Sequence, residues 1–165
     1  MLYSLEIKID SLWIKVISNE EEIEKLSLLS ENFFIEEGSP KKRRVPYWLR
    51  RLEGDLRNYF SGQRVDFGKY PLKIANYSVF SQKVWREVKK IPYGEVRSYK
   101  WIGKKLNTRG YRAIGRVLSL NPFPLLIPCH RVVKKNGSLG GFSQGEEIKK
   151  RLLEIEGVFC EGGIN

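Results

Sequence analysis

The tetrapeptide Pro128-Cys129-His130-Arg131 constrains the fold of this chain more than any other segment. His130 is the only histidine among the 165 residues, and Cys129 is one of two cysteines. The apolar residues on either side, Ile127 and Val132-Val133, predict that the tetrapeptide lies at the end of a buried strand. A thiol beside an imidazole is typical of a thiolate nucleophile with its base. Because neighbouring side chains on a strand point to opposite faces, we expect His130 to reach the sulfur only through a bend or a bridging water.

A lone cysteine is more often an inert packing residue, so the interpretation depends on the rest of the sequence. Charge is the first guide. Residues 1–75 hold 13 basic and 12 acidic residues, whereas residues 76–165 hold 17 and 7. No acidic residue lies between Glu95 and Glu146, although ten basic ones do. This asymmetry indicates that the second half meets a polyanion, in the first place nucleic acid.

Cysteine and histidine usage also excludes several classes. Two cysteines give no disulfide framework, and the first 128 residues contain neither Cys nor His, which excludes an ordinary zinc site there. A bridge from Cys129 to Cys160 would consume the candidate nucleophile, so a reduced, intracellular protein fits better. No signal peptide and no membrane-spanning apolar run is evident. We expect a cytoplasmic protein without a metal or cofactor.

The first half is predicted to be a small α/β unit without catalytic residues. Its expected elements are strands over residues 2–9 and 12–17, an acidic helix from Glu20 to Leu29, and a helix from Pro46 that ends at Ser61-Gly62. The stretch 63–77 is interpreted as the connection between domains. This places the two domains at residues 1–74 and 75–165.

The second half is predicted to contain a helix-turn-helix pattern. Its expected elements are a helix over Ser78–Lys90, a helix from Tyr99 to Leu106 capped by Ser98, a helix capped by Thr108 that runs to about Leu120, a strand over Leu125–Val133, and a helix opened by a Ser143/Glu146 capping box and stopped by Gly157. The helix after Thr108 has an inward apolar face of Tyr111, Ile114, Val117 and Leu118, and an outer face of Arg109, Arg112, Ala113, Arg116 and Ser119. Small residues among arginines suit close approach to a nucleic-acid backbone.

Five segments together resemble the O6-alkylguanine-DNA alkyltransferases. They are Tyr93–Tyr99, Arg112–Gly115, Asn121–Val133, Gly141–Ser143 and Leu152–Gly157. The resemblance covers residues of about 78–157 and is weak in the amino-terminal half. It implies an α/β (α+β) chain, with a small ribonuclease H-like amino-terminal domain followed by a winged helix-turn-helix domain that carries the active site and binds DNA.

The resemblance also implies a direct repair reaction. The protein would bind double-stranded DNA that carries O6-alkylguanine, flip the damaged base out, and transfer the alkyl group irreversibly to Cys129, so that each molecule acts once. We expect a monomer in the cytoplasm of a prokaryote, associated with the nucleoid. The sequence leaves open whether copies bind cooperatively along DNA.

Residue roles follow from the same resemblance. Cys129 would accept the alkyl group, His130 would deprotonate it through a water, Glu156 would orient His130, and Tyr99 would bond the flipped guanine and help to protonate the departing base. The remaining DNA- and base-binding residues would be Arg112, which fills the gap left by the flipped nucleotide, Asn121, which joins the recognition helix to the cysteine strand, the main chain at Val132 and the Ser143 region, which read the guanine edges, and Ala113, Arg109, Arg116 and Ser98. The recognition helix would dock in the minor groove. Arg116, Ser119 and Leu120 depart from the groups seen in relatives.

Two other interpretations remain open from the sequence. A winged helix-turn-helix regulator without chemistry would use the same basic half but leaves the Cys129-His130 pair unexplained. A cysteine hydrolase built on Cys129, His130 and Glu156 would explain the triad, but not the acid-free arginine face.

Overall fold

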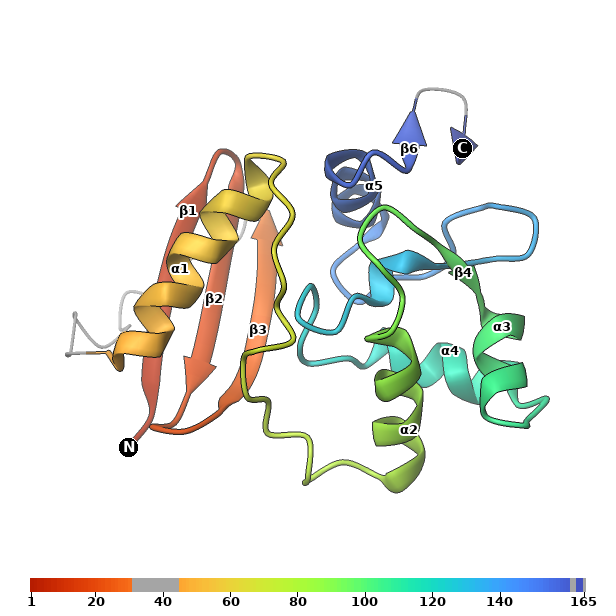
Figure 1. The fold of residues 1–165 in the computed structure, drawn as a ribbon, viewed down its shortest axis with the longest axis horizontal. Coiled ribbons are helices and arrows are strands. Elements are labelled where there is room, and N and C mark those ends of the chain that lie inside the picture. Colours follow the sequence, from red (N-terminus) through yellow and green to blue (C-terminus); the bar gives the residue numbers. More distant parts are fainter. Residues whose placement is uncertain (31–44, 161–162, 165) are drawn as a thin grey trace. The chain divides into compact units, whose positions relative to one another are not determined.

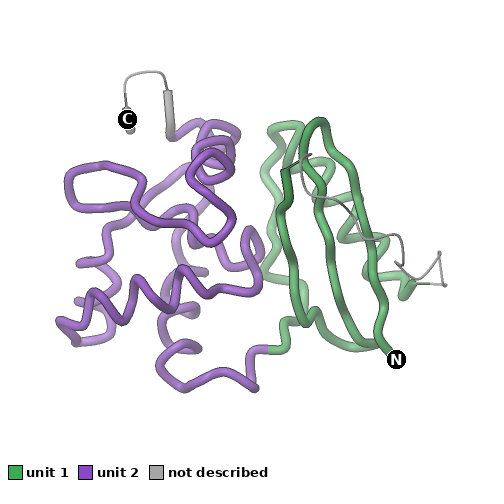
Figure 2. Tube along the Cα trace, turned by 180° about the vertical axis from the view of Figure 1, so that it is seen from behind, with its two compact units in different colours: residues 1–73 green, residues 74–165 purple. Residues whose placement is uncertain are grey.

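The computed structural model describes residues 1–30, 45–160 and 163–164 (Figure 1). The architecture is mixed α/β, with a small antiparallel sheet and several helices. The chain divides into two compact units, Met1–Lys73 and Ile74–Asn165 (Figure 2). The sequence had placed this division after residue 74. Among the described residues, no helix is both long enough and apolar enough to cross a membrane.

The first unit is an antiparallel three-stranded sheet with one helix on it. The strands β1 (Tyr3–Ile9), β2 (Leu12–Ser18) and β3 (Ile23–Ser30) lie in the order β1-β2-β3. Alternate residues of β2 are buried, as the period of a strand with one covered face requires. Helix α1 (Tyr47–Phe60) lies across one face of this sheet (Figure 1). Its buried residues are Leu49, Leu52, Leu56 and Tyr59.

The helix predicted from Glu20 to Leu29 is wrong, because most of this segment forms β3. Leu26 pairs with Val16 and Leu28 with Ile14, so both leucines bury on the same face of the sheet. The turn before β3 is built by Asn19, whose side-chain oxygen accepts hydrogen bonds from the N–H groups of Glu21 and Glu22, each at 2.7 Å. Ile23 and Leu26 are spaced as on a helix face, but pairing with β2 satisfies the backbone along the strand and determines the outcome.

The second unit contains the remaining elements. They are α2 (Val79–Val88), β4 (Arg97–Ser98), α3 (Tyr99–Lys105), α4 (Tyr111–Ser119), the 3-10 turn η1 (Cys129–Arg131), β5 (Val132–Val133), α5 (Glu146–Ile155), β6 (Phe159–Cys160) and β7 (Gly163–Ile164). β4 pairs with β5 in parallel, and β6 pairs with β7 in antiparallel fashion. The pairing of β4 with β5 places the start of α3 beside the segment that carries Cys129.

Helices α3 and α4 approach each other closely at Gly103. A Cβ atom on Gly103 would lie 2.6 Å from the Tyr111 ring and 2.8 Å from the Thr108 carbonyl oxygen, so no larger residue fits without a shift. The predicted cap of α3 is present, because the Ser98 hydroxyl accepts from the Trp101 N–H at 3.2 Å. Thr108 does not cap α4. Its hydroxyl accepts from the N–H of Gly110 at 3.1 Å, and the helix begins at Tyr111.

Two further predictions for this unit are corrected. Only Val132-Val133 of the strand expected over Leu125–Val133 pairs as a strand with another element, because prolines remove ladder donors and the chain turns at Leu125, where φ is 74°. The capping box expected from Ser143 is absent. Helix α5 begins after Gly145, whose φ is 94°, and the Ser143 side chain makes no cap hydrogen bond.

Replacement of Gly103 by alanine tests the contact between α3 and α4. Gly103→Ala should lower the free energy of unfolding by about 1–3 kcal/mol, because the new methyl group overpacks against Tyr111 and the Thr108 carbonyl. Gly115→Ala in α4 is the matched control, since a Cβ there meets only a Tyr99 ring carbon at 3.8 Å and alanine favours the helix. Urea unfolding of both variants measures the difference. Equal stability of the two variants would contradict this account.

Candidate active site

The Cys129 thiol is buried at the start of η1. Its side chain is almost inaccessible, and Sγ accepts a hydrogen bond from Asn121 Nδ2 at 3.1 Å. Burial raises the pKa of Cys129 to about 11, although the Asn121 hydrogen bond and the positive charge of Lys149 act in the opposite direction. The resting sulfur is therefore a neutral thiol near pH 7, and its use as a nucleophile requires a base.

Asn121 joins the end of α4 to the segment that carries the thiol. Besides Sγ, its Nδ2 donates to the Ile127 carbonyl at 3.1 Å, and its Oδ1 accepts from the Phe123 N–H at 2.9 Å. The loop between Asn121 and Ile127 is anchored further by Phe123, whose buried ring meets the ring of Trp85 on α2 edge to face. Both ends of the Asn121 amide are thus used within one short loop, so the position of the sulfur is tied to that of α4.

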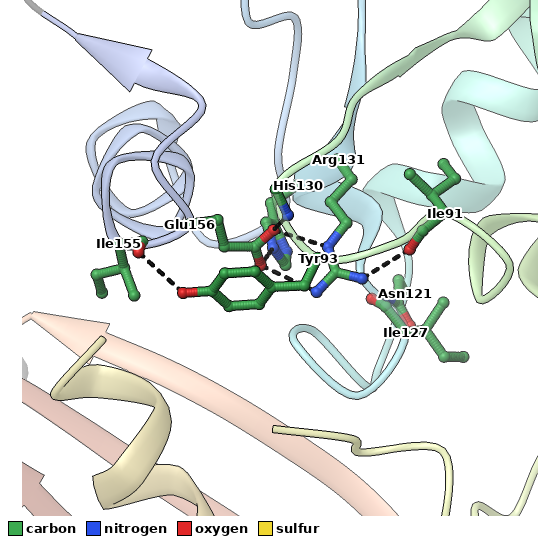
Figure 3. Close-up of polar contacts among 9 residues, drawn as sticks. Ile91, Tyr93, Asn121, Ile127, His130, Arg131, Ile155 and Glu156 are labelled. Atoms are coloured by element: carbon green, nitrogen blue, oxygen red, sulfur yellow. Dashed lines mark hydrogen bonds and ion pairs between the residues drawn. The ribbon is translucent and has the colours of Figure 1, made fainter. Parts of the chain in front are cut away.

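His130 is fully buried and meets Glu156 at the end of α5. Its Nε2 lies 2.7 Å from Glu156 Oε1 (Figure 3). Burial alone would raise the pKa of Glu156, but His130 and Arg131 outweigh it and lower the pKa to about 2. An ionised carboxylate assigns the imidazole proton to Nε2, which leaves Nδ1 as the basic nitrogen. Nδ1 is buried and has no hydrogen-bond partner among the described residues. Burial also lowers the pKa of His130, against the opposing effect of Glu156, and this favours the neutral ring.

Arg131 clamps the same carboxylate from a second side. Its Nε donates to Glu156 Oε2 at 2.9 Å and its Nη2 donates to Oε1 at 3.0 Å, a bidentate pair. Its Nη1 donates to the Ile91 carbonyl at 2.7 Å (Figure 3). The Gly94 N–H also donates to Oε2, at 3.1 Å, and the Tyr93 hydroxyl donates to the Ile155 carbonyl at 2.9 Å. Sequence reasoning assigned no separate role to Arg131.

Lys149 is the residue that sequence reasoning missed. Its side chain is fully buried on α5, and Nζ donates to the carbonyls of Val132, at 2.7 Å, and of Leu139. Burial lowers the pKa of Lys149 to about 8. The sequence placed Ile148, Leu152 and Ile155 on the inward face of this helix. Lys149 lies one turn before the buried Leu152 and Leu153, so helical spacing could have indicated that its side chain faces inward.

Tyr99 stands at the first turn of α3, half buried. Burial raises the pKa of Tyr99, and negative charge on Cys129 acts in the same direction. A Cβ atom on Gly140 would lie 3.1 Å from the Tyr99 hydroxyl oxygen, and Gly140 has a φ of 69°, so this loop requires glycine there. The loop between β5 and α5 therefore passes directly beside the Tyr99 hydroxyl.

The residues predicted to face DNA lie mostly on the outer side of α4. Arg109, just before the helix, and Arg112, Ala113 and Arg116 within it are exposed, whereas Ile114 and Leu118 are buried. Tyr111 was predicted to point inward, but it is 38% exposed because it packs along the edge of α3 at Gly103.

Three other residues predicted to bind DNA or the guanine lie outside α4. The Ser98 hydroxyl is engaged in the cap of α3, and the Val132 carbonyl accepts from Lys149. Ser143 is exposed in the loop before α5, and its hydroxyl accepts from Gln144 at 3.3 Å. In the described part of the chain, no three His, Cys, Asp or Glu side chains gather into a group that could hold a metal ion.

Comparison with known proteins identifies the family. Residues 79–158 match the family model described as 6-O-methylguanine DNA methyltransferase, DNA binding domain. A methylated-DNA--protein-cysteine methyltransferase of Archaeoglobus fulgidus is 46% identical over 110 residues, which cover 63% of this chain and 72% of that protein. The chain belongs to the 6-O-methylguanine DNA methyltransferase family. The protein of the same name from Metallosphaera sedula is 51% identical over 102 residues, 62% of this chain, and the match spans 64% of that relative's length.

Solved structures of the family share the fold over nearly the whole chain. An O6-methylguanine DNA methyltransferase from Methanococcus jannaschii is 33% identical, with a TM-score of 0.67 over 94% of this chain and 95% of that chain. The Mycobacterium tuberculosis OGT in complex with DNA is 27% identical, with a TM-score of 0.78 over 94% and 93%. The likeness therefore includes the amino-terminal unit, where the sequence alone resembled relatives only weakly.

Acid titration of stability tests the state of Glu156. Its pKa is about 2 in the folded chain against an ordinary 4.5, so its ionised form stabilises the fold above pH 4.5 and this contribution is lost as the pH falls towards 2. The full contribution is roughly 3 kcal/mol. Relative to Glu156→Gln, the parent's advantage in urea unfolding should be present at pH 7 and shrink as the pH falls below 4.5 towards 2. A difference independent of pH would contradict the assignment.

Removal of Lys149 tests its structural role. Lys149→Met should lower the free energy of unfolding by about 1–3 kcal/mol, because the carbonyls of Val132 and Leu139 lose a buried donor. Lys150→Met is the matched control. Lys150 is exposed and lies 3.7 Å from Glu154, a surface pair worth less than about 1 kcal/mol. Thermal or urea unfolding separates the two variants, and equal destabilisation by both would refute the role of Lys149.

Proposed function

We propose that this chain repairs DNA directly, by transferring an alkyl group from O6 of guanine in duplex DNA to its own Cys129. The observation that carries the proposal is a buried neutral thiol joined through Asn121 to a cationic helix, with a buried His130–Glu156 pair at the adjacent residue. Membership of the 6-O-methylguanine DNA methyltransferase family supports it.

The proposed reaction has three steps: deprotonation of the thiol, transfer of the alkyl group, and protonation of the departing guanine. The thiol proton passes to Nδ1 of His130, through a bridging water, and Glu156 stabilises the imidazolium that forms. The thiolate then attacks the carbon bound to O6, so an S–C bond forms as the C–O bond breaks. The departing guanine takes up a proton delivered with help from the Tyr99 hydroxyl, and the imidazolium of His130 gives up the proton it took from the thiol, so no net proton is gained or lost. The thioether is stable, so each molecule acts once.

The contacts of the charged neighbours support a role for each of them. Arg131 keeps Glu156 ionised, and an ionised Glu156 keeps the imidazole proton on Nε2, away from the nitrogen that must accept the thiol proton. Because the pKa of Cys129 is raised to about 11, the thiolate forms only when His130 accepts the proton. The positive charge of nearby Lys149 partly offsets the rise that burial causes in the pKa of the thiol.

DNA binding is assigned to the carboxy-terminal domain, residues 75–165, which is proposed to be a winged helix-turn-helix domain. Helices α3 and α4 supply the helix-turn-helix, and the paired β4 and β5 with the loop that follows supply the wing. Helix α4 would enter the minor groove, where small Ala113 permits close approach and Arg112 fills the gap left by the flipped guanine. Arg109, Arg116 and Ser98 would contact DNA on the same approach, and Val132 and Ser143 would contact the flipped base.

The amino-terminal domain, residues 1–74, is proposed to be a small ribonuclease H-like domain. Its antiparallel strands covered by α1 support this description. The rival function for the whole chain is a winged helix-turn-helix regulator without chemistry, which the cationic surface of α4 would serve equally well. The presence or absence of alkyl transfer distinguishes the two.

Intact-mass measurement after incubation with a duplex that contains O6-benzylguanine tests the proposed function. One benzyl group should be added per chain, and only once. Cys129→Ser should add none while it retains most of its DNA affinity, because the cationic surface is unchanged. Cys160→Ser is the matched control and should react like the parent. A benzyl group mapped to another residue, or repeated turnover that releases the alkyl group, would overturn the proposal.

A further inference from the structure

Helix α3 carries three cations that the proposed reaction does not use. Of the ten basic residues between Glu95 and Glu146, Arg97 pairs with Glu95 at 2.5 Å and Arg131 pairs with Glu156. None of the other eight has a carboxylate partner among the described residues. Three of the eight, Lys100, Lys104 and Lys105, are exposed on α3, whose other side buries Ile102 and Gly103.

An aromatic ring holds part of this cationic surface in place. The Lys105 ammonium lies 5.3 Å and the Arg97 guanidinium 5.8 Å from the centroid of the Trp101 ring. Such cation–π contacts restrict the lysine before any partner arrives, which reduces the entropic cost when a partner binds. Because cations already occupy positions over the ring, the surface suits a partner that offers negative charge more than one that must stack on the indole.

Helix α3 is held against α4, the helix that carries the arginines, by a close contact. The last turn of α3 leads through a short loop into α4 (Figure 1). Gly103 sits against both Tyr111 and the Thr108 carbonyl. The helices cannot separate without breaking this contact, so Lys104 and Lys105 hold a fixed position relative to Arg109. A linear polyanion bound along α4 can therefore meet α3 as a second contact without rearrangement.

We propose that the outer face of α3, made of Lys100, Lys104 and Lys105, binds the phosphate backbone of duplex DNA to one side of the nucleotide engaged by α4. The proposal rests on the proposed function, which places the alkylated guanine next to α4. Lysine ammonium groups are point charges that bind phosphates without reading the base sequence. Two of the lysines, Lys100 and Lys104, are one helical turn apart, so both present their charges to the same side.

Salt titration of DNA affinity tests this surface. The triple variant Lys100→Gln/Lys104→Gln/Lys105→Gln should bind a long duplex more weakly at low salt. The slope of log K against log salt should become shallower by about 0.9 for each phosphate that is no longer neutralised, up to roughly 2.7. The control is Lys83→Gln/Arg86→Gln/Lys89→Gln, which removes three exposed charges from α2 and its carboxyl end in the same unit. Its slope should match that of the parent. Equal slopes for all three proteins, or equally shallow slopes for both variants, would overturn the proposal.

The position of the α3 surface on DNA is tested with duplexes extended on only one side of the lesion. The α3 variant should bind one of the two extended duplexes more weakly than the parent does and match the parent on the other. Equal weakening on both would overturn the assignment to one flank.

Reaction with free O6-benzylguanine, which requires no DNA, separates this proposal from the proposed function. The α3 variant should react at the parent rate. If the parent transfers the benzyl group but the salt slopes are equal, the α3 proposal alone fails. If the slopes differ as expected but neither DNA nor the free base alkylates Cys129, the proposed reaction fails and the α3 proposal stands.

Discussion

The buried carboxylate of Glu156 is the interaction on which the second unit depends. A carboxylate without partners in this interior would cost several kcal/mol, so the fold must bring donors to it. They come from two separate segments that converge on the end of α5: His130 and Arg131 from η1, and the Gly94 N–H from the turn before β4. The same pairing that satisfies this charge fixes the ring of His130, the residue that follows Cys129. The stability of the unit and the arrangement of its candidate proton relay therefore have one origin.

Asn121 is the second joint, and it is neutral. Its amide uses hydrogen bonds to the Ile127 carbonyl, the Phe123 N–H and the thiol to fix the loop that follows α4. The amide positions the sulfur, and its hydrogen bond lowers the pKa of the thiol against the larger effect of burial. Glu156 thus determines which nitrogen of His130 carries the proton, whereas Asn121 fixes the position of the sulfur relative to the cationic helix α4.

Local signals made much of this predictable. Ser98 before a helical pattern, Gly157 after one, and the apolar frame of the Cys129 segment depend on neighbours in the sequence. Predictions failed where distant pairing decided. Ile23 to Ser30 became a strand because β2 offered partners. The Thr108 cap failed for a local reason, because its hydroxyl accepts from the Gly110 N–H and α4 begins only at Tyr111. The hydrogen bonds of Arg131 and Lys149 could not be predicted from the sequence. Arg131 donates to the carbonyl of Ile91, which is far away in the sequence. Lys149 donates to the carbonyl of Leu139, which lies in a loop whose path local signals do not define.

The burial of Cys129 has a consequence for the molecule before it meets any damage. Oxidants and stray electrophiles attack cysteines according to thiolate character and exposure. Cys129, which is 3% exposed and whose pKa is raised to about 11, offers little of either. The proposed reaction consumes the thiol once, so any side reaction of Cys129 would inactivate the molecule permanently. Burial therefore protects the unreacted protein for as long as it stays folded.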